Sequence, residues 1–205
     1  MEAINMIQNR RSVNHFDAAR KLDNETIRQI INLAVNAPSA NNLQPWRIIV
    51  IESEAAKEKL WNIAFKQQKV KDAAVNVLVV GNKNGWDKNN PVWDEMLQTV
   101  GGNKDIVEAS QKGAAMGNGS TEERRIAFAQ SNSGLLAMSI MYAASALGVD
   151  SHPMNGFDYA AVQKEFGLAE HEMPVMNICL GYFDQSKTLH PRRPRRGFDE
   201  IAKVL

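Results

Sequence analysis

Residues 121–147 place the strongest limit on how this chain of 205 residues can fold, because their pattern predicts one long helix that is apolar on more than one face. Thr121 is a suitable N-cap, Glu122 and Glu123 place negative charge in the first turn, and Gly148 marks the end. At about 1.5 Å per residue, such a helix is roughly 40 Å long. We expect it to be central in the fold or shared with a second chain, because its apolar residues are spread around it: Ile126, Leu135, Leu136, Met138, Ile140, Tyr142, Ala143 and Leu147.

Shorter helices and strands alternate along the rest of the chain. The run Val75–Val80 is continuously apolar and of strand length, which predicts a central strand of a sheet. The alternation predicts an α+β or α/β sandwich, and we expect one domain over residues 1–205. The expected helices cover residues 2–9, 24–37, 53–65, 104–117 and 157–166, and the expected strands cover 46–51, 75–80 and 175–182.

The overall charge argues against a general role in binding nucleic acid or a membrane surface. The chain has 24 basic and 23 acidic side chains, a formal net charge of +1. No signal peptide is visible at the N-terminus, and the longest apolar stretch, residues 135–149, is too short for a bilayer of about 30 Å. A cytoplasmic location is therefore expected. The single cysteine, Cys179, lies in an apolar run, where a buried inert thiol is the favoured interpretation over a nucleophile.

Motifs that bring their own chemistry are missing from the sequence. No Gly-x-Gly-x-x-Gly follows a predicted strand, no Gly-x-Ser-x-Gly occurs, and the four histidines have no zinc-ligand spacing. We therefore expect no metal site and name no catalytic residue. A chain with many polar anchors and no such motif suits an organic cofactor that carries the chemistry itself.

The segment Ala37–Trp46, between a predicted helix and a predicted strand, is more polar than a simple connection requires. Pro38 and Pro45 stiffen it, while Ser39, Asn41, Asn42 and Gln44 offer donors and acceptors. One interpretation is a rigid platform for a polar ligand. The other is a helix stop followed by an Asx-rich turn.

The segment Arg192–Arg196 concentrates basic charge near the C-terminus. Such a run is commonly a solvated tail. Two prolines stiffen it here, so a local anion site is the alternative, because guanidinium groups match phosphate oxygens.

Five segments together resemble the nitroreductase family of FMN-dependent oxidoreductases, in the family's order and spacing. They are residues 10–17, 37–46, 67–73, 147–157 and 191–196. The resemblance implies a three-layer α/β/α nitroreductase-like fold of the α+β class with a mixed, mainly antiparallel sheet. It also implies a homodimer in which both chains hold each of two FMN molecules.

The activity that the resemblance implies is hydride transfer from NADH or NADPH to the flavin, and then to a nitroaromatic, a quinone or another flat acceptor, in a ping-pong order. No nucleic acid or membrane partner is implied. Specialised relatives remain alternatives, such as an enone reductase, a dehalogenase or a flavin-modifying enzyme. A flavin-binding protein without enzymatic activity is a further alternative.

The resemblance assigns cofactor binding residue by residue. On one subunit, residues 10–12 match contacts to the phosphate, ribityl chain and ring, and residues 195–196 match a phosphate-binding pair. The 38–42 loop comes from the other subunit. Residues 153–156 match the loop over the reactive flavin nitrogen. The implied FMN-binding residues are Arg10, Arg11, Ser12, Asn14, Pro38, Ser39, Ala40, Asn42, Gln67, Lys69, Pro153, Met154, Asn155, Gly156, Arg195 and Arg196, with Arg193 as an alternative in the C-terminal pair.

Two positions depart from the family pattern. Asn14 stands where the family often has a basic residue, and Asn155 where it often has a glutamate. Lys69 matches the cation at the pyrimidine edge of the flavin, where positive charge favours the reduced, anionic form. Since Asn14 brings no charge, the resemblance leaves two alternatives: a lower flavin potential, or Lys69 supplying that charge alone.

Residues 82–98 combine Asn, Gly and Lys with the large apolar side chains of Trp86, Trp93, Met96 and Leu97. They form either a loop over a small satellite core or a wall of a substrate pocket. The sequence slightly favours the pocket for at least one of the two tryptophans.

Overall fold

The computed structural model describes residues 3–205. In chain order its elements are α1 (Ala3–Asn9), α2 (Asn24–Ala34), the 3-10 helix η1 (Ala40–Asn42), β1 (Trp46–Ile51), α3 (Glu54–Ile63), α4 (Gln68–Asp72), β2 (Val75–Asn82), α5 (Val92–Thr99), α6 (Lys104–Asn118), α7 (Glu122–Ala146), β3 (Asp150–Met154), α8 (Tyr159–Glu165), β4 (Glu172–Gly181) and α9 (Phe198–Ile201).

The four strands form one antiparallel sheet in the order β1-β2-β4-β3. In β2 every residue from Val75 to Gly81 is buried, which confirms the predicted central strand. An isolated parallel bridge joins Ser12 to Ser151, so the N-terminal segment continues the sheet along the free edge of β3. The pairing is thus mixed but mainly antiparallel, as the resemblance implied.

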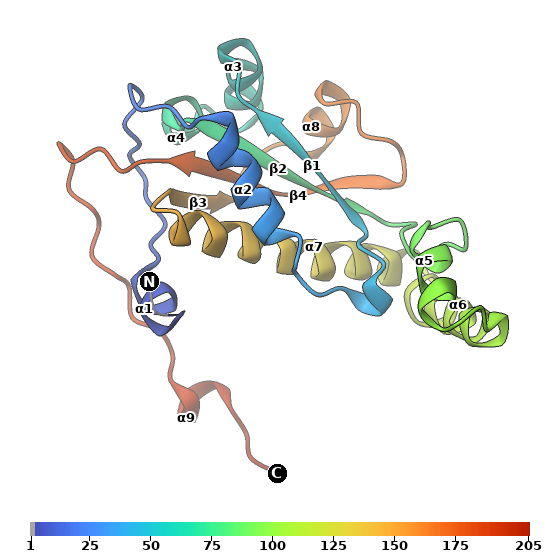
Figure 1. Cartoon of the computed structure of the whole chain (residues 1–205). Coiled ribbons are helices and arrows are strands. Elements are labelled where there is room, and N and C mark those ends of the chain that lie inside the picture. The colour runs from blue at the N-terminus through green and yellow to red at the C-terminus, as the bar shows by residue number, and fades with distance from the viewer. Residues whose placement is uncertain (1–2) are drawn as a thin grey trace.

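Two apolar cores make the fold a three-layer sandwich (Figure 1). On one face of the sheet, α2 and α7 pack against side chains such as Val77 and Ile178. On the other face, α3, α4 and α8 cover side chains such as Leu78 and Cys179. Alternate residues of β2 and β4 therefore serve opposite cores, as the two-residue period of a strand requires.

The helix α7 lies against the sheet for most of its 25 residues (Figure 1). The Thr121 hydroxyl accepts a hydrogen bond from Arg124 N–H at 3.2 Å, which confirms the predicted cap. Side chains such as Leu136 and Ile140 are fully buried, whereas Leu135 is 45% exposed. The helix is central, and its outer face keeps apolar side chains without cover from this chain.

Local structure differs from the sequence-based expectations at several places. The helix expected to reach Pro38 ends at Ala34, where the Asn36 amide donates to the Asn32 and Leu33 carbonyl oxygens. The short helices α4 and α5 were not predicted. Pro153 and Met154 were expected in a loop but lie in edge strand β3, where a proline without an N–H is tolerated.

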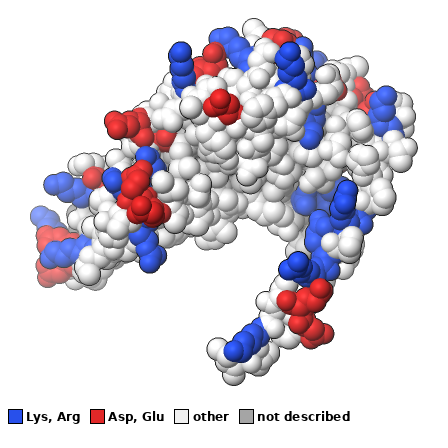
Figure 2. Space-filling model, turned by 180° about the vertical axis from the view of Figure 1, so that it is seen from behind, with Lys and Arg blue, Asp and Glu red and all other residues white. Residues whose placement is uncertain are grey.

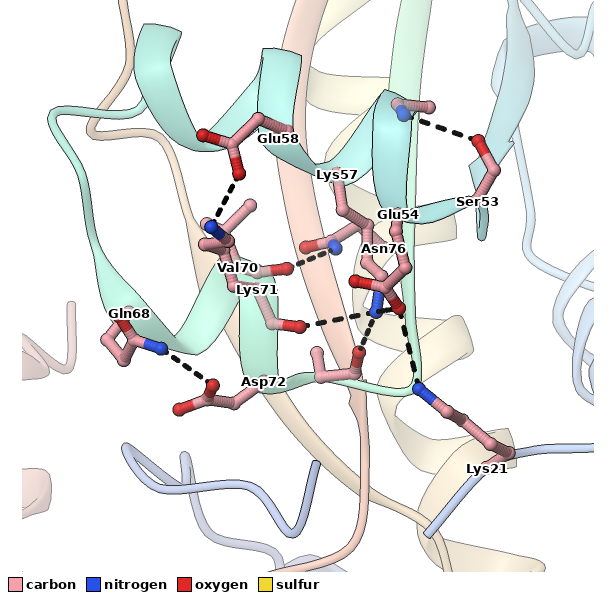
Figure 3. A network of polar contacts seen from close by, with 12 residues as sticks. Lys21, Ser53, Glu54, Lys57, Glu58, Gln68, Val70, Lys71, Asp72 and Asn76 are labelled. Carbon is pink, nitrogen blue, oxygen red and sulfur yellow. Dashed lines mark hydrogen bonds and ion pairs between the residues drawn. The ribbon is translucent and has the colours of Figure 1, made fainter. Parts of the chain in front are cut away.

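The buried side chain of Lys57 ties α3 to α4 (Figure 3). Its ammonium donates to the carbonyl oxygens of Lys71 at 3.2 Å and Ala73 at 3.1 Å, and it lies 3.0 Å from the Glu54 carboxylate. Those carbonyls lie at the C-terminal end of α4, which carries partial negative charge and has no helical partner for them. Lys57 thus stabilises a helix of five residues that is too short to persist alone.

The segment 82–98 packs over a satellite core at the N-terminal end of α7. Trp93 is 2% exposed and packs with Leu43, Val107 and Phe128, and its indole N–H donates to the Asp87 carbonyl oxygen at 2.9 Å. Trp86 is half-buried, and its N–H donates to the Lys83 carbonyl oxygen at 3.0 Å. For Trp93 these contacts favour the satellite-core interpretation, because α5 and α6 form a pair of helices that buries the indole.

Within residues 3–205, no helix is both long enough and apolar enough to cross a membrane.

Candidate functional site

Residues Arg10–Asn14 leave α1 and run along the free edge of β3. The Val13 N–H donates to the Ser151 carbonyl oxygen at 3.2 Å. Val13 is fully buried, while its neighbours Ser12 and Asn14 face a cavity. Strand-like alternation therefore places the predicted polar residues on the open side.

That cavity of about 710 Å³ is lined by basic side chains from both ends of the chain. The Arg11 guanidinium donates to the His190 carbonyl oxygen, and Arg192 donates to the Gln8 carbonyl oxygen at 2.5 Å. Among the described residues, no carboxylate lines the cavity, so its charge is positive throughout. Figure 2 shows Lys and Arg gathered where the C-terminal segment leaves the body. The lining residues are Arg10, Arg11, Ser12, Asn14, His190, Pro191, Arg192, Arg193, Pro194 and Arg195; Arg196 is not one of them.

Arg10 is the least satisfied of these cations. Its Nη1 atom is buried and, within residues 3–205, has no hydrogen-bond partner. Burial lowers the pKa of Arg10, the neighbouring Tyr142 opposes that shift, and the charges of Arg192 and Arg195 add to it. A buried N–H donor without an acceptor is unfavourable in isolation, and a bound anion would satisfy it.

Beside this cavity, Lys69 and His152 form a contact that reaches the N-terminal segment. Lys69 Nζ lies 3.2 Å from His152 Nε2 and 3.3 Å from Gln67 Oε1. His152 Nδ1 lies 2.8 Å from the Val13 carbonyl oxygen. Since that carbonyl can only accept, Nδ1 carries the proton and Nε2 accepts from the ammonium.

Gln67, the N-cap residue of α4, connects that helix to the segment after β3. Its amide donates to the Gly156 carbonyl oxygen at 2.8 Å and to the Ala64 carbonyl oxygen at 3.2 Å. A Cβ at residue 156 would lie 3.2 Å from the Gln67 amide nitrogen, so glycine allows this close approach. Three predicted segments, residues 10–14, 67–69 and 153–156, therefore meet in one region of the fold.

His152 is a site residue that the sequence did not single out. Burial lowers its pKa to about 4, with the charge of Lys69 acting in the same direction and the bond to Val13 opposing it. The imidazole is therefore neutral near pH 7. Its neighbour Met154 points into the core, where its sulfur lies 3.9 Å from Cys179 Sγ, while Asn155 is exposed.

Cys179 is fully buried, and burial raises its pKa to about 12. This confirms the expectation of a buried thiol, and a neutral thiol without solvent access is a poor nucleophile. Within residues 3–205, no three His, Cys, Asp or Glu side chains are grouped to hold a metal ion.

The loop 38–42 contacts α7 at Asn132 and does not line the basic cavity. Asn41, Asn42 and the nearby Gln44 have φ of 50°, 55° and 45°, a left-handed backbone that costs free energy in residues other than glycine. The Ala40 N–H donates at 2.8 Å to the carboxamide oxygen of Asn132, a buried residue of α7 that the sequence also did not single out. The loop is held rigidly and has more strain than a simple turn requires.

Within one chain, this loop does not join the basic cavity. Asn132 holds the loop, whereas the residue of α7 whose electrostatic effect reaches Arg10 is Tyr142, ten residues further on, or about 15 Å along the axis. No residue from 38 to 42 lines the basic cavity. One chain thus presents two separate halves of the predicted site.

Comparison with known proteins agrees with this fold. The family described as the nitroreductase family matches residues 7–182. A Bacillus subtilis (strain 168) protein provisionally named NAD(P)H nitroreductase YodC is 30% identical over 178 residues, 87% of this chain and 88% of its own. NADH dehydrogenase of Thermus thermophilus is 34% identical over 160 residues, 76% of this chain and 75% of its own.

Solved structures agree as well. The nitroreductase-like YdfN of Bacillus subtilis superposes with a TM-score of 0.91 at 28% identity, covering 100% of this chain and 99% of the other. A nitroreductase-like protein of Exiguobacterium sibiricum 255-15 in complex with FMN gives 0.82 at 27% identity, covering 100% and 98%. The protein belongs to the nitroreductase family, and its α+β fold is that of the family.

Proposed function

We propose that this protein is an FMN-dependent oxidoreductase that uses NADH or NADPH to reduce a flat acceptor such as a nitroaromatic or a quinone. The observation that carries the proposal is the meeting of residues 10–14, 67–69 and 156 beside a cavity lined by Arg10, whose buried Nη1 has no hydrogen-bond partner within residues 3–205. Bound FMN would supply the chemistry, by taking a hydride from the nicotinamide and passing it to the acceptor. Donor and acceptor using one position in turn gives a ping-pong order.

The residues of the basic cavity fit the phosphate of FMN. That group carries nearly two negative charges, and Arg10 has a buried donor without an acceptor. Arg11, Arg193 and Arg195 line the same cavity and add charge. Ser12 and Asn14 line the same cavity and supply neutral donors and acceptors.

The residues around Lys69 fit the ring. The ammonium of Lys69 is half-buried, so its field is less screened than that of a surface lysine. A fixed cation at that edge favours negative charge on the ring system. Gly156 lets the backbone approach closely, which suits a planar ligand. No side chain is proposed as acid, base or nucleophile.

A homodimer would complete the site, with the 38–42 loop coming from the second chain. The separation of the two half-sites on α7 supports this assembly. So does the C-terminal segment, which projects from the body and has apolar side chains in solvent (Figure 1). Burial of such residues against a second copy is favourable. The exposed apolar side chains on α1, α2, α7 and the C-terminal segment are Ile4, Ile7, Leu33, Val35, Leu135, Leu147, Phe198, Ile201, Val204 and Leu205.

The direct test is the visible spectrum of the purified protein. Flavin absorption, or its recovery on incubation with FMN but not FAD, is expected, followed by anaerobic bleaching with NADH or NADPH. Arg10→Met should weaken FMN binding about 10–100-fold, the effect of losing a charge-assisted hydrogen bond of about 1.5–3 kcal/mol. Arg28→Met, on the exposed face of α2, removes equal charge and should leave binding unchanged. Protein that takes up no FMN would refute the proposal.

A further inference from the structure

His152 occupies the point where two elements of the proposed flavin site meet. It lies in β3, between the N-terminal segment on one side and α4 on the other. One ring nitrogen bonds to the backbone of Val13, whose neighbours Ser12 and Asn14 line the basic cavity. The other ring nitrogen bonds to the ammonium of Lys69. A single rigid ring is therefore hydrogen-bonded both to Lys69 and to the segment proposed to hold the phosphate.

The chemistry of the imidazole suits this double contact. A neutral imidazole has one donor and one acceptor on opposite sides of a planar ring. The Val13 carbonyl oxygen accepts from Nδ1–H. The lone pair of Nε2 is then free to accept a hydrogen bond from the Lys69 ammonium. Lysine has a flexible four-carbon stem, so its charge needs such a partner to stay in one place. The second contact of Lys69 is to Oε1 of Gln67, the N-cap residue of α4, two positions earlier in the chain.

We propose that His152 is a positioning residue that holds the ammonium of Lys69 at the edge of the flavin and so sets how easily the flavin is reduced. The inference rests on the proposed function. His152 acts through Lys69 and need not touch the cofactor. Its substitution should therefore change the flavin potential only while Lys69 is present.

Two substitutions separate the two bonds of the ring. His152→Gln keeps an acceptor near the position of Nε2 and loses the donor to Val13. His152→Asn keeps a donor near the position of Nδ1 and no longer reaches Lys69. A role confined to stabilising the fold would make these variants alike, whereas the proposed role makes them differ.

The experiment measures the midpoint potential of bound FMN by anaerobic spectroelectrochemical titration, and FMN affinity by fluorescence. His152→Asn should lower the preference for reduced over oxidised flavin about threefold to tenfold, a fall in potential of about 15–30 mV for a two-electron couple. His152→Gln should stay within twofold of the unmodified protein. Lys69→Met should shift the preference at least tenfold, and adding His152→Asn to it should change nothing further.

The results that overturn the inference are specific. Equal potentials for His152→Asn and His152→Gln would show that the contact with Lys69 does not matter. Additive effects of His152→Asn and Lys69→Met would show that His152 acts by another route. If the unmodified protein takes up no FMN, the proposed function and this inference both fail; if it does, only the inference is at stake.

Discussion

The ammonium of Lys57 lies 3.1 Å from the carbonyl oxygen of Ala73, and this bond fastens α3 to the end of the helix that carries Lys69. The lysine is 1% exposed, and its bond to the Lys71 carbonyl oxygen adds to the same anchor. The interior of the α3–α4 layer is thus held by a charge rather than by apolar contact alone. Removing this charge should lower the free energy of unfolding.

Lys57→Met should lower the free energy of unfolding by about 1–3 kcal/mol, because the two carbonyl oxygens lose their partner while the apolar stem is kept. Lys59→Met is the matched control on the same helix, since Lys59 is exposed and pairs with Glu165 at 2.7 Å. A change of at most about 1 kcal/mol is expected there. Urea unfolding of both variants checks this, and equal losses would contradict the role of Lys57.

His152 should make the stability depend on pH between about 4 and 6.5. Burial lowers its pKa from 6.5 to about 4, so below pH 6.5 the unfolded chain binds a proton that the folded protein does not. Stability therefore falls as pH falls through this window. The loss from this residue is about 1–2 kcal/mol after a discount for partial solvent exposure. Urea titrations from pH 4 to 7 should show a flatter curve for His152→Gln, and parallel curves would exclude the effect.

Trp93→Ala should cost about 3–5 kcal/mol of stability, because the indole is buried in the satellite core and its N–H is bonded. Met116→Ala on α6 is the control, as Met116 is 78% exposed and should change stability by less than about 0.5 kcal/mol. Thermal melts test both. Kinetics with several acceptors complete the comparison: a changed acceptor ranking at unchanged stability would favour the pocket wall instead.

Leu135→Arg should break the proposed dimer. Leu135 is 45% exposed on the outer face of α7, where a charge has room in a monomer and none in an apolar interface. Light scattering should change from about twice 22.8 kDa to 22.8 kDa, with weaker FMN binding. Tyr159→Arg, at 41% exposure on α8 across the sheet, should stay dimeric. An FMN-loaded monomer of the unmodified protein would contradict the assembly.

Local sequence signals predicted most of the elements correctly. The Thr121 cap and the buried run of β2 both depend on residues within a few positions of one another. The short edge strand β3 was not predicted because it contains Pro153, and proline is uncommon inside strands. The helices α4 and α5 are too short to show a helical period.

The residues proposed for the cofactor were identified by resemblance, but their arrangement was not. Arg10, Lys69 and Gly156 lie in segments that resemble the family and match individual positions of its pattern. His152 lies inside one of those segments but was not singled out, and Asn132 lies outside all of them, since a lone histidine or a helix asparagine has no local pattern that marks a function. Their roles follow only from their partners, the Val13 carbonyl oxygen and the Ala40 N–H.

The sequence by itself determined the family, the layered α+β class, the central helix and the basic segments proposed to bind a phosphate, because propensity, capping and charge act over short stretches. Only the tertiary structure decided which of these segments meet. The contact of His152 with Lys69 spans 83 positions and that with Val13 spans 139. Such contacts depend on the register of β3 against β4 and on where Lys57 anchors α4, and a one-residue change of register would turn His152 to the opposite face.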